Sequence, residues 1–188
     1  MQPLGKVIYT VRSYVGGHGE EFNRWQREEH IPILLGLPGY YAVNRFEQAD
    51  RPEAFMNVWE VESSEVFDSP KHDAVKTPWR VRMAAVRREH RVDFYKPVEN
   101  GVILGPSSSR TPSYLTRYDA DQAALDALLR LAGELAGEPE TCFVRVVRSQ
   151  KDLKAVLLMH YALASGQRAI SDPSAAGVVT TTYNHLVV

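Results

Sequence analysis

The densest group of chemically useful side chains is a short helical run that contains Trp25, Glu29 and His30. At about 100° per residue, Phe22, Glu29 and Ile33 fall near the centre of one face, with Trp25 and His30 on its flanks. A carboxylate in an apolar stripe needs a partner or a proton, because a lone buried charge is costly. A neutral imidazole beside it suits acid/base chemistry near neutral pH. His30 and Glu29 are therefore the candidate catalytic residues.

Pro32 lies inside the same run and gives His30 an unusual backbone setting. Because proline has no N–H to donate to the carbonyl of Glu28, we expect a bend just after His30. A structural interpretation stays open, and for a lone helix it is the more common one. Glu29 would then accept a hydrogen bond from a buried donor, such as Arg45 or a tyrosine hydroxyl, and His30 would cap the freed carbonyl.

The remaining histidines and the cysteine are less well placed for chemistry. His160 and His185 fall on neighbouring predicted strands, but no carboxylate is placed to complete a metal triad, so we predict no metal site. A haem would need an axial ligand, and nothing singles out a histidine for it. Cys142 opens a predicted strand, which favours a buried small hydrophobe over a nucleophile. We predict no cofactor.

One segment is locally basic. Its arginines are Arg80, Arg82, Arg87, Arg88 and Arg91. Such a cluster can attract an anionic substrate, but a solvated helix face is the more common explanation. Both interpretations stay open.

Composition excludes several classes of protein. The 188 residues include 22 Lys+Arg against 23 Asp+Glu, a near-balance that argues against a large nucleic-acid footprint. A single cysteine excludes an internal disulfide and a multi-cysteine metal site. No apolar run approaches the roughly 20 residues that span a bilayer, and the first residues lack the apolar core of a secretory signal. We expect a cytoplasmic protein.

The first half of the chain reads as β-α-β-β-α-β. Alternating β-branched and aromatic residues predict strands, and a 3.6-residue apolar period predicts helices. The predicted strands are 5–12, 40–47, 55–62 and 91–98, and the predicted helices are 20–35 and 77–89. Leu37-Pro38-Gly39 ends the first helix.

A weaker version of this order follows a loop at 105–109. The predicted strands are 114–118, 142–147, 155–161 and 178–187, with a helix at 121–137 and a helical or irregular piece at 164–170. We interpret the chain as two split β-α-β units in tandem. Because each unit has helices on one side of its sheet only, the two bare faces are expected to pack together into a barrel-like core.

The run Trp25-x-x-x-Glu29-His30-Ile31-Pro32, with Leu37-Pro38-Gly39-Tyr40 behind it, resembles the signature of EthD-like proteins of the dimeric α/β-barrel superfamily. Thr77-Pro78-Trp79-Arg80-Val81-Arg82-Met83 is similar to their second helix, and the likeness covers residues 4–98. It implies an α+β fold of tandem ferredoxin-like β-α-β-β-α-β repeats forming a single-chain dimeric α/β-barrel. The expected domains are 1–104, with the pocket, and 110–188, a degenerate repeat that supplies the partner sheet.

The resemblance also implies a ligand pocket between the sheet and its helices, faced by His30 with Glu29 nearby. The substrate-binding residues would be Trp25, Tyr9, Tyr41, Asn57, Trp59, Trp79 and Met83. Core packing is the more common role for any single one of these wall residues. The helix at 121–137 has leucines and alanines where the first helix has Trp25, Glu29 and His30, so we expect one pocket per chain.

The superfamily includes cofactor-independent monooxygenases, polyketide cyclases, lactone isomerases and haem-degrading enzymes. The resemblance therefore implies an enzyme that acts without a cofactor on an aromatic, polyketide-like or lactone substrate, with His30 as acid/base. The alternatives are a non-catalytic small-ligand-binding or interaction protein of the same fold, and a haem-binding variant. The expected partners are a small-molecule substrate and a second copy of the chain in a homodimer, with no nucleic acid or membrane.

Overall fold

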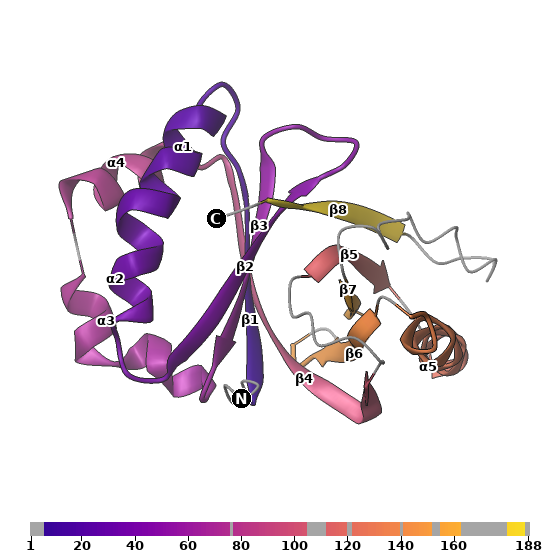
Figure 1. Cartoon of the computed structure of the whole chain (residues 1–188). Coiled ribbons are helices and arrows are strands. Elements are labelled where there is room, and N and C mark those ends of the chain that lie inside the picture. Colours follow the sequence, from indigo (N-terminus) through magenta and orange to yellow (C-terminus); the bar gives the residue numbers. More distant parts are fainter. Residues whose placement is uncertain are drawn as a thin grey trace. The chain divides into compact units, whose positions relative to one another are not determined.

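The computed structural model describes residues 6–75, 77–104, 112–119, 122–139, 141–151, 155–162 and 180–186 (Figure 1). It has an α+β fold, and strands pair antiparallel in both units. The chain divides into two compact units. Unit 1 comprises Met1–Glu47, Arg51–Phe94 and Leu186–Val188, and unit 2 comprises Gln48–Asp50 and Tyr95–His185.

The sheet of unit 1 is built on strands β1 (Val7–Tyr14), β2 (Tyr40–Gln48) and β3 (Ala54–Val61). Strand β3 lies between the other two and pairs antiparallel with both. All eight of its residues are buried, which fits its central place in the sheet. These three strands confirm the predicted ones to within two residues at each end.

The helices of unit 1 lie on one face of this sheet (Figure 1). They are α1 (Gly19–Trp25), a π-helical turn (Gln26–His30), α2 (Ile31–Leu35), a 3-10 turn (Ser64–Asp68), α3 (Pro70–Ala74) and α4 (Pro78–Val86). Two apolar clusters fill the space between helices and sheet. One is formed by Val7, Ile31, Leu34, Tyr40, Trp59 and Val61, and the other by Val15, Phe22, Trp25, Phe55 and Met83.

The predicted helix at 20–35 is present, and its irregularity falls where Pro32 predicts it. The N–H of Ile31 donates to the carbonyl of Gln26, five residues back, so the helix widens into a π turn that ends at His30. Pro32 follows directly and can neither donate to the Glu28 carbonyl nor pack closely against it. Single π turns inside α-helices are found often at functional sites.

Gly39 makes the tight exit from α2 into β2. Its φ angle of 86° lies in the region that favours glycine. A Cβ atom at this position would come within 2.6 Å of Cγ1 of Val66. The predicted end of the helix at Leu37-Pro38-Gly39 therefore has both a conformational and a steric reason.

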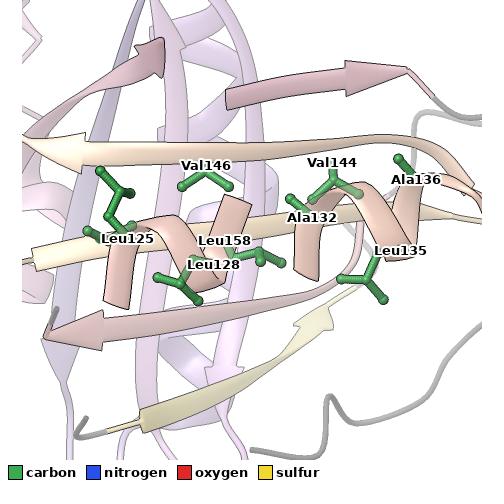
Figure 2. Packing of buried hydrophobic residues seen from close by; sticks show 9 residues of the cluster. Leu125, Leu128, Ala132, Leu135, Ala136, Val144, Val146 and Leu158 are labelled. Atoms are coloured by element: carbon green, nitrogen blue, oxygen red, sulfur yellow. The ribbon is translucent and has the colours of Figure 1, made fainter. Parts of the chain in front are cut away.

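Unit 2 has the antiparallel strand order β4-β6-β7-β5-β8. These strands are β4 (Glu89–Leu104), β5 (Pro112–Asp119), β6 (Thr141–Ser149), β7 (Ala155–Ala162) and β8 (Thr180–Leu186). Helix α5 (Gln122–Ala136) packs on β6 and β7. Figure 2 shows the apolar residues of α5 facing Val144, Val146 and Leu158 of the sheet. The leucine stripe predicted at 121–137 is therefore core.

Strand β4 differs most from its prediction, because it continues to Leu104 instead of ending at residue 98. Its register with β6 shifts between Pro97 and Val102, and Asn100 has a φ of 56°. Proline and a left-handed residue are tolerated at such a bulge, so residues that usually end a strand here only interrupt its pairing.

The described residues do not test some of the predictions. The piece at 164–170 and the loop at 105–109 lie outside the described residues. The tandem repeat and the domains 1–104 and 110–188 therefore stay predictions. Within the described ranges, no helix combines the length and the apolar character needed to cross a membrane.

Candidate active site

His30 is the last residue of the π turn, and aromatic rings hold its imidazole. The ring stacks on the indole of Trp25, with centroids 4.4 Å apart and planes at 26°. The edge of Trp59, a buried residue of β3, meets it at 6.2 Å and 89°. Among the described residues, His30 has no hydrogen-bond partner. No described residue therefore holds the ring nitrogens by a hydrogen bond.

Glu29 is bound to Trp25 and to α4. Its Oε1 accepts a hydrogen bond from Nε1 of Trp25 at 3.1 Å and another from Oγ1 of Thr77. Thr77 also caps α4 by accepting from the N–H of Arg80 at 3.0 Å. Glu29 thus fixes the indole on which His30 stacks, and it ties the first helix to the start of α4.

A buried polar layer lies between α1 and the sheet. Nε of Arg45 donates to Oδ1 of Asn57 at 3.2 Å, and Nη2 donates to Oδ1 of Asn23 at 2.7 Å. Nδ2 of Asn57 donates in turn to Oε1 of Gln26 at 2.9 Å. Burial, with a smaller effect of the Arg27 charge, lowers the pKa of Arg45 to about 10, opposed by Glu47. Arg45 still carries its positive charge at neutral pH.

His30 and this layer meet at a small cavity of about 20 Å³, which is room for about one water. Its polar lining is Ser13, Gln26, His30, Asn57 and Arg87, and its apolar lining is Val11, Phe22 and Phe55. None of these side chains is a carboxylate. Among the described lining residues, Arg87 alone carries a formal charge, which is positive.

The surroundings keep His30 uncharged. Burial, followed by the effect of nearby basic groups, lowers the pKa of His30 to about 3. In order of effect these groups are Arg80, Arg87, His72 and Arg45. At neutral pH the imidazole is therefore a neutral group that can accept a hydrogen bond, and its low pKa makes it a weak proton acceptor before a ligand binds.

Tyr9 of β1 stays protonated in the same field. Burial raises the pKa of Tyr9 to about 12, although Arg87 and Arg80 oppose this rise. Its ring lies 3.8 Å from that of Phe67 and 5.1 Å from that of Phe94, measured between centroids. Tyr9 is therefore available as a hydroxyl donor.

Tyr40, His72 and Arg80 form a further hydrogen-bonded group. Oη of Tyr40 lies 2.8 Å from Nδ1 of His72, and Nη2 of Arg80 lies 3.4 Å from its Nε2. Because an arginine only donates, Nε2 must accept, so the proton of neutral His72 lies on Nδ1 and is donated to Tyr40. Burial, and then the charge of Arg80, lowers the pKa of His72, which favours this neutral form.

The structure brings several of the predicted site residues together. Trp25, Glu29, His30 and Trp59 are linked by ring contacts or hydrogen bonds, and Asn57 lines the cavity with His30. Met83 is fully buried beside Trp25 in the cluster that also contacts Trp79.

Tyr9 and Tyr41 are placed differently. Tyr9 belongs to the aromatic group next to the site, and the charges of Arg87 and Arg80 act to lower its pKa. Tyr41 lies at a register shift of β2, and among the described residues the tyrosine in contact with Trp59 and His72 is its neighbour Tyr40. The predicted binding role of Tyr41 stays a prediction.

Sequence reasoning did not assign Tyr40, His72 or Arg87 to the site. For the arginines a signal was present, since Arg80 and Arg87 are seven residues apart and thus on one helical face. Both are half-buried, whereas Arg82 and Arg88 of the same basic segment are exposed. For Tyr40 and His72 the sequence holds no comparable signal, because their contact joins residues 32 positions apart.

The other candidate groups lie elsewhere. His160 is fully buried in unit 2, where its Nε2 lies 2.6 Å from Oγ1 of Thr141. The side chains of Cys142 and His185 are outside the described residues. The described part of the chain contains no group of three or more His, Cys, Asp or Glu side chains that could hold a metal ion.

A larger hollow of about 540 Å³ lies on unit 1 at the start of α1. Its charged lining has both signs and consists of Glu20, Arg24, Arg27, Glu47 and Glu53. Glu53 is held by the N–H groups of Gly17 and Gly19, and these bonds lower its pKa. No residue predicted for the site lines this hollow.

No family model and no curated protein matches the sequence. Solved structures do match the fold. A proposed monooxygenase from Lactobacillus acidophilus NCFM has a TM-score of 0.60 at 10% identity, covering 96% of this chain and 94% of its own. One from Fusobacterium nucleatum subsp. nucleatum has a TM-score of 0.64 at 10% identity, covering 96% and 92%. An anthrone oxidase-like protein has a TM-score of 0.59 at 14% identity, covering 100% and 94%.

The likeness shows the fold alone. It agrees with the predicted α/β-barrel-like fold, and it does not confirm the narrower EthD-like resemblance.

Proposed function

We propose that this chain is a small-molecule enzyme of the oxidase or monooxygenase type and that its active site is the His30 cavity of unit 1. The observation that carries the proposal is a neutral imidazole on a π turn that has no hydrogen-bond partner among the described residues, at a cavity where Arg87 is the one charged side chain of the described lining. The names of the neighbours in fold support the reaction type. The EthD-like resemblance of residues 25–40 points the same way.

The proposed substrate is an aromatic, polyketide-like molecule with an acidic C–H, such as a methylene group between two aryl rings. His30 takes one proton from this carbon. The resulting carbanion reduces dioxygen, one oxygen atom stays on the carbon as a carbonyl, and the other leaves as water with the two hydrogens of the methylene group. The balance is one methylene and one dioxygen giving one carbonyl and one water, and the substrate supplies all the electrons.

The neighbouring residues have positioning roles in this proposal. Trp25 fixes the plane of the imidazole by stacking, and Glu29 fixes Trp25 through the indole N–H. Glu29 thus acts through Trp25. Trp59, Asn57 and Tyr9 are the proposed substrate contacts nearest to His30.

The size of the cavity limits how the substrate enters. About 20 Å³ holds one water-sized group and not an aromatic ring. Only one water-sized group of the substrate fits in the cavity as it stands, so the rest of the substrate reaches His30 only if lining side chains move. His30 and Arg87 are the half-buried polar members of the lining, so they are the ones with room to move.

The two units also support a proposal about the fold. The order β8-β5-β7-β6 in unit 2 is that of a split β-α-β sheet, and β2-β3-β1 in unit 1 has the corresponding order for its first three strands. We infer that unit 2 is a copy of the fold of unit 1 that has lost the site. Helix α5 carries core leucines where the first helix carries Trp25, Glu29 and His30.

Dioxygen consumption tests the proposed function directly. Purified protein is incubated with anthrone as the probe, and oxygen uptake and anthraquinone formation are measured for wild type, His30→Gln and His18→Gln. His18 is exposed in the loop before α1, so its variant is the matched control. Loss of a general base costs about 100-fold or more, so we expect His30→Gln to fall by at least that factor and His18→Gln to match wild type.

Equal rates in all three proteins would overturn the role of His30. If wild type binds anthrone without consuming oxygen, the binding-protein alternative replaces the enzyme.

A further inference from the structure

Arg80 and Arg87 give the site a positive charge that the protein itself does not neutralise. Both are half-buried, and in the described part of the chain neither forms an ion pair with a carboxylate. Arg80 is held in place by the carbonyls of Val75 and His72 at the end of α3. Two cations without a counter-ion among the described residues are costly in a half-buried place, unless an anion is bound there at some stage.

Arg87 has a buried donor without a described partner and also lines the cavity. Its Nη1 lies 3.2 Å from Nδ1 of His90, but its Nε is buried and has no hydrogen-bond partner among the described residues. The same side chain lines the cavity together with Ser13, His30 and Asn57. A buried guanidinium donor without a partner is unusual, and an acceptor atom in the cavity would satisfy it.

Resting on the function proposed above, we propose that the ligand of this site carries an organic oxyanion, a carboxylate or a phenolate, whose oxygen enters the cavity and accepts a hydrogen bond from Arg87. The cavity admits one water-sized atom, which fits one anionic oxygen. Ser13 and Asn57 add polar groups on the same lining. Arg80 contributes at longer range, as a fixed charge.

The charges around His30 extend this inference to the state of the imidazole. The groups that affect it are Arg80, Arg87, His72 and Arg45, all of them cationic or basic. An anion beside Arg87 offsets their repulsion of a proton. Ligand binding therefore raises the pKa of His30 and makes it a stronger proton acceptor once the site is filled.

Matched pairs of small aromatic probes test the charge preference. Benzoate is compared with benzamide, and 4-nitrophenolate with 4-nitroanisole, by calorimetry on the full chain. We expect at least one anion to bind about tenfold or more tightly than its neutral partner, because a charge-assisted hydrogen bond is lost in the neutral form. A preference confined to benzoate identifies a carboxylate ligand, and one confined to 4-nitrophenolate identifies a phenolate.

Three variants locate the anion. Arg87→Met is expected to lose this preference, with about a tenfold or larger loss of anion affinity, and Arg87→Lys to keep part of it. Arg88→Met is the matched control, because Arg88 is the exposed next residue, and its anion affinity should stay within about twofold of wild type. Near-UV circular dichroism checks that each variant is folded. If Arg87→Met does not fold, Arg87→Lys still tests the role of the arginine.

The absorbance of 4-nitrophenol gives a second readout. Bound next to Arg87, it should ionise at lower pH than in free solution, and this shift should vanish in the Met variant. Equal binding of neutral and anionic probes, failure of both anions to bind, or equal losses in the Arg87 and Arg88 variants would overturn the inference. If the wild-type protein shows no charge preference but still carries out His30-dependent oxidation, this inference is wrong and the proposed reaction stands. Arg87-dependent anion binding without any oxidation defeats the proposed reaction alone.

Discussion

Glu29 is the residue whose part in the structure differs most from a simple acid/base pair with His30. Both of its hydrogen bonds come from donors at the helix–helix contact, the indole N–H of Trp25 and the hydroxyl of Thr77. The structural interpretation of Glu29 expected it to accept a hydrogen bond from a buried donor, such as Arg45 or a tyrosine. Glu29 does accept from a buried donor, but this donor is Trp25. The imidazole depends on Glu29 through the indole.

This contact predicts the effect of removing the carboxylate. Glu29→Leu leaves the two donors without an acceptor, which should lower the free energy of unfolding by about 1–3 kcal/mol. Glu29→Gln keeps an acceptor oxygen and should lose less. Urea unfolding followed by circular dichroism measures both.

The control for this change is Glu28→Leu, at an exposed neighbour that forms a 3.8 Å ion pair with Arg27. Its free energy of unfolding should stay within about 0.5 kcal/mol of wild type. A Glu29→Leu protein as stable as the Glu28→Leu protein would show that the two hydrogen bonds do not contribute.

Helix α4 is the element that brings the cations to the site. Thr77 caps it by accepting from the N–H of Arg80, and the same hydroxyl donates to Glu29. The start of α4 is thereby fixed against the first helix. Arg80 lies in the first turn of α4 and its N–H is the donor to the cap, whereas Arg87 directly follows the last residue of α4, so the placement of both depends on this helix.

Removal of the cap gives a prediction for the whole element. Thr77→Ala should lower the free energy of unfolding by about 1–2 kcal/mol, the usual cost of a lost N-cap, and should weaken anion binding at the same time. Thr77→Ser keeps the hydroxyl and is the matched control. Urea unfolding and benzoate calorimetry on the two variants give the two readouts, and equal values for Ala and Ser would mean that the hydroxyl does not position α4.

The β-α-β-β-α-β order from β1 to β4 could be predicted from the sequence because each of its signals is local. Alternation marks the strands, and Leu37-Pro38-Gly39 marks the helix exit that the φ of Gly39 requires. The π turn is local too, because Pro32 removes one donor. The contacts of individual residues could not be predicted as well from the sequence. A bulge in β2 shifts the alternation by one residue, so the pattern could not tell whether Tyr40 or Tyr41 faces the helices.

The positive charge around His30 also could not be predicted from the sequence, because it depends on where α4 packs. Arg80 and Arg87 belong to a basic segment, and such segments are usually solvated. Only packing distinguishes these two from Arg82 and Arg88, which are exposed. The segment alone left both interpretations open, and the folded molecule favours an anion for two of its five arginines.

At the scale of the folded molecule, the buried imidazole makes stability depend on pH. The pKa of His30 falls from 6.5 to about 3 on folding, so between these values the unfolded chain binds more protons. The free energy of unfolding should therefore fall as pH falls from about 6.5 towards 3, and His30→Gln should show a smaller fall. His72 and His90, whose pKa values are also lowered by burial, contribute with the same sign in both proteins.

Tryptophan fluorescence during urea unfolding measures this at several pH values. All three tryptophans, Trp25, Trp59 and Trp79, lie in unit 1, so the signal reports on the unit that holds the site. His18→Gln is the control. Parallel pH profiles for wild type and His30→Gln would contradict the expected contribution of the imidazole.

The central claim is that burial and nearby cations hold His30 neutral at the cavity. The most direct test is a pH titration by NMR of protein with isotope-labelled histidines, with the His30 signal assigned by its absence from His30→Gln. We predict that His30 stays neutral from about pH 8 down to about pH 4.5, well below the ordinary midpoint of a histidine. Addition of benzoate should move its midpoint upward. A midpoint near 6.5 in the free protein would contradict the account.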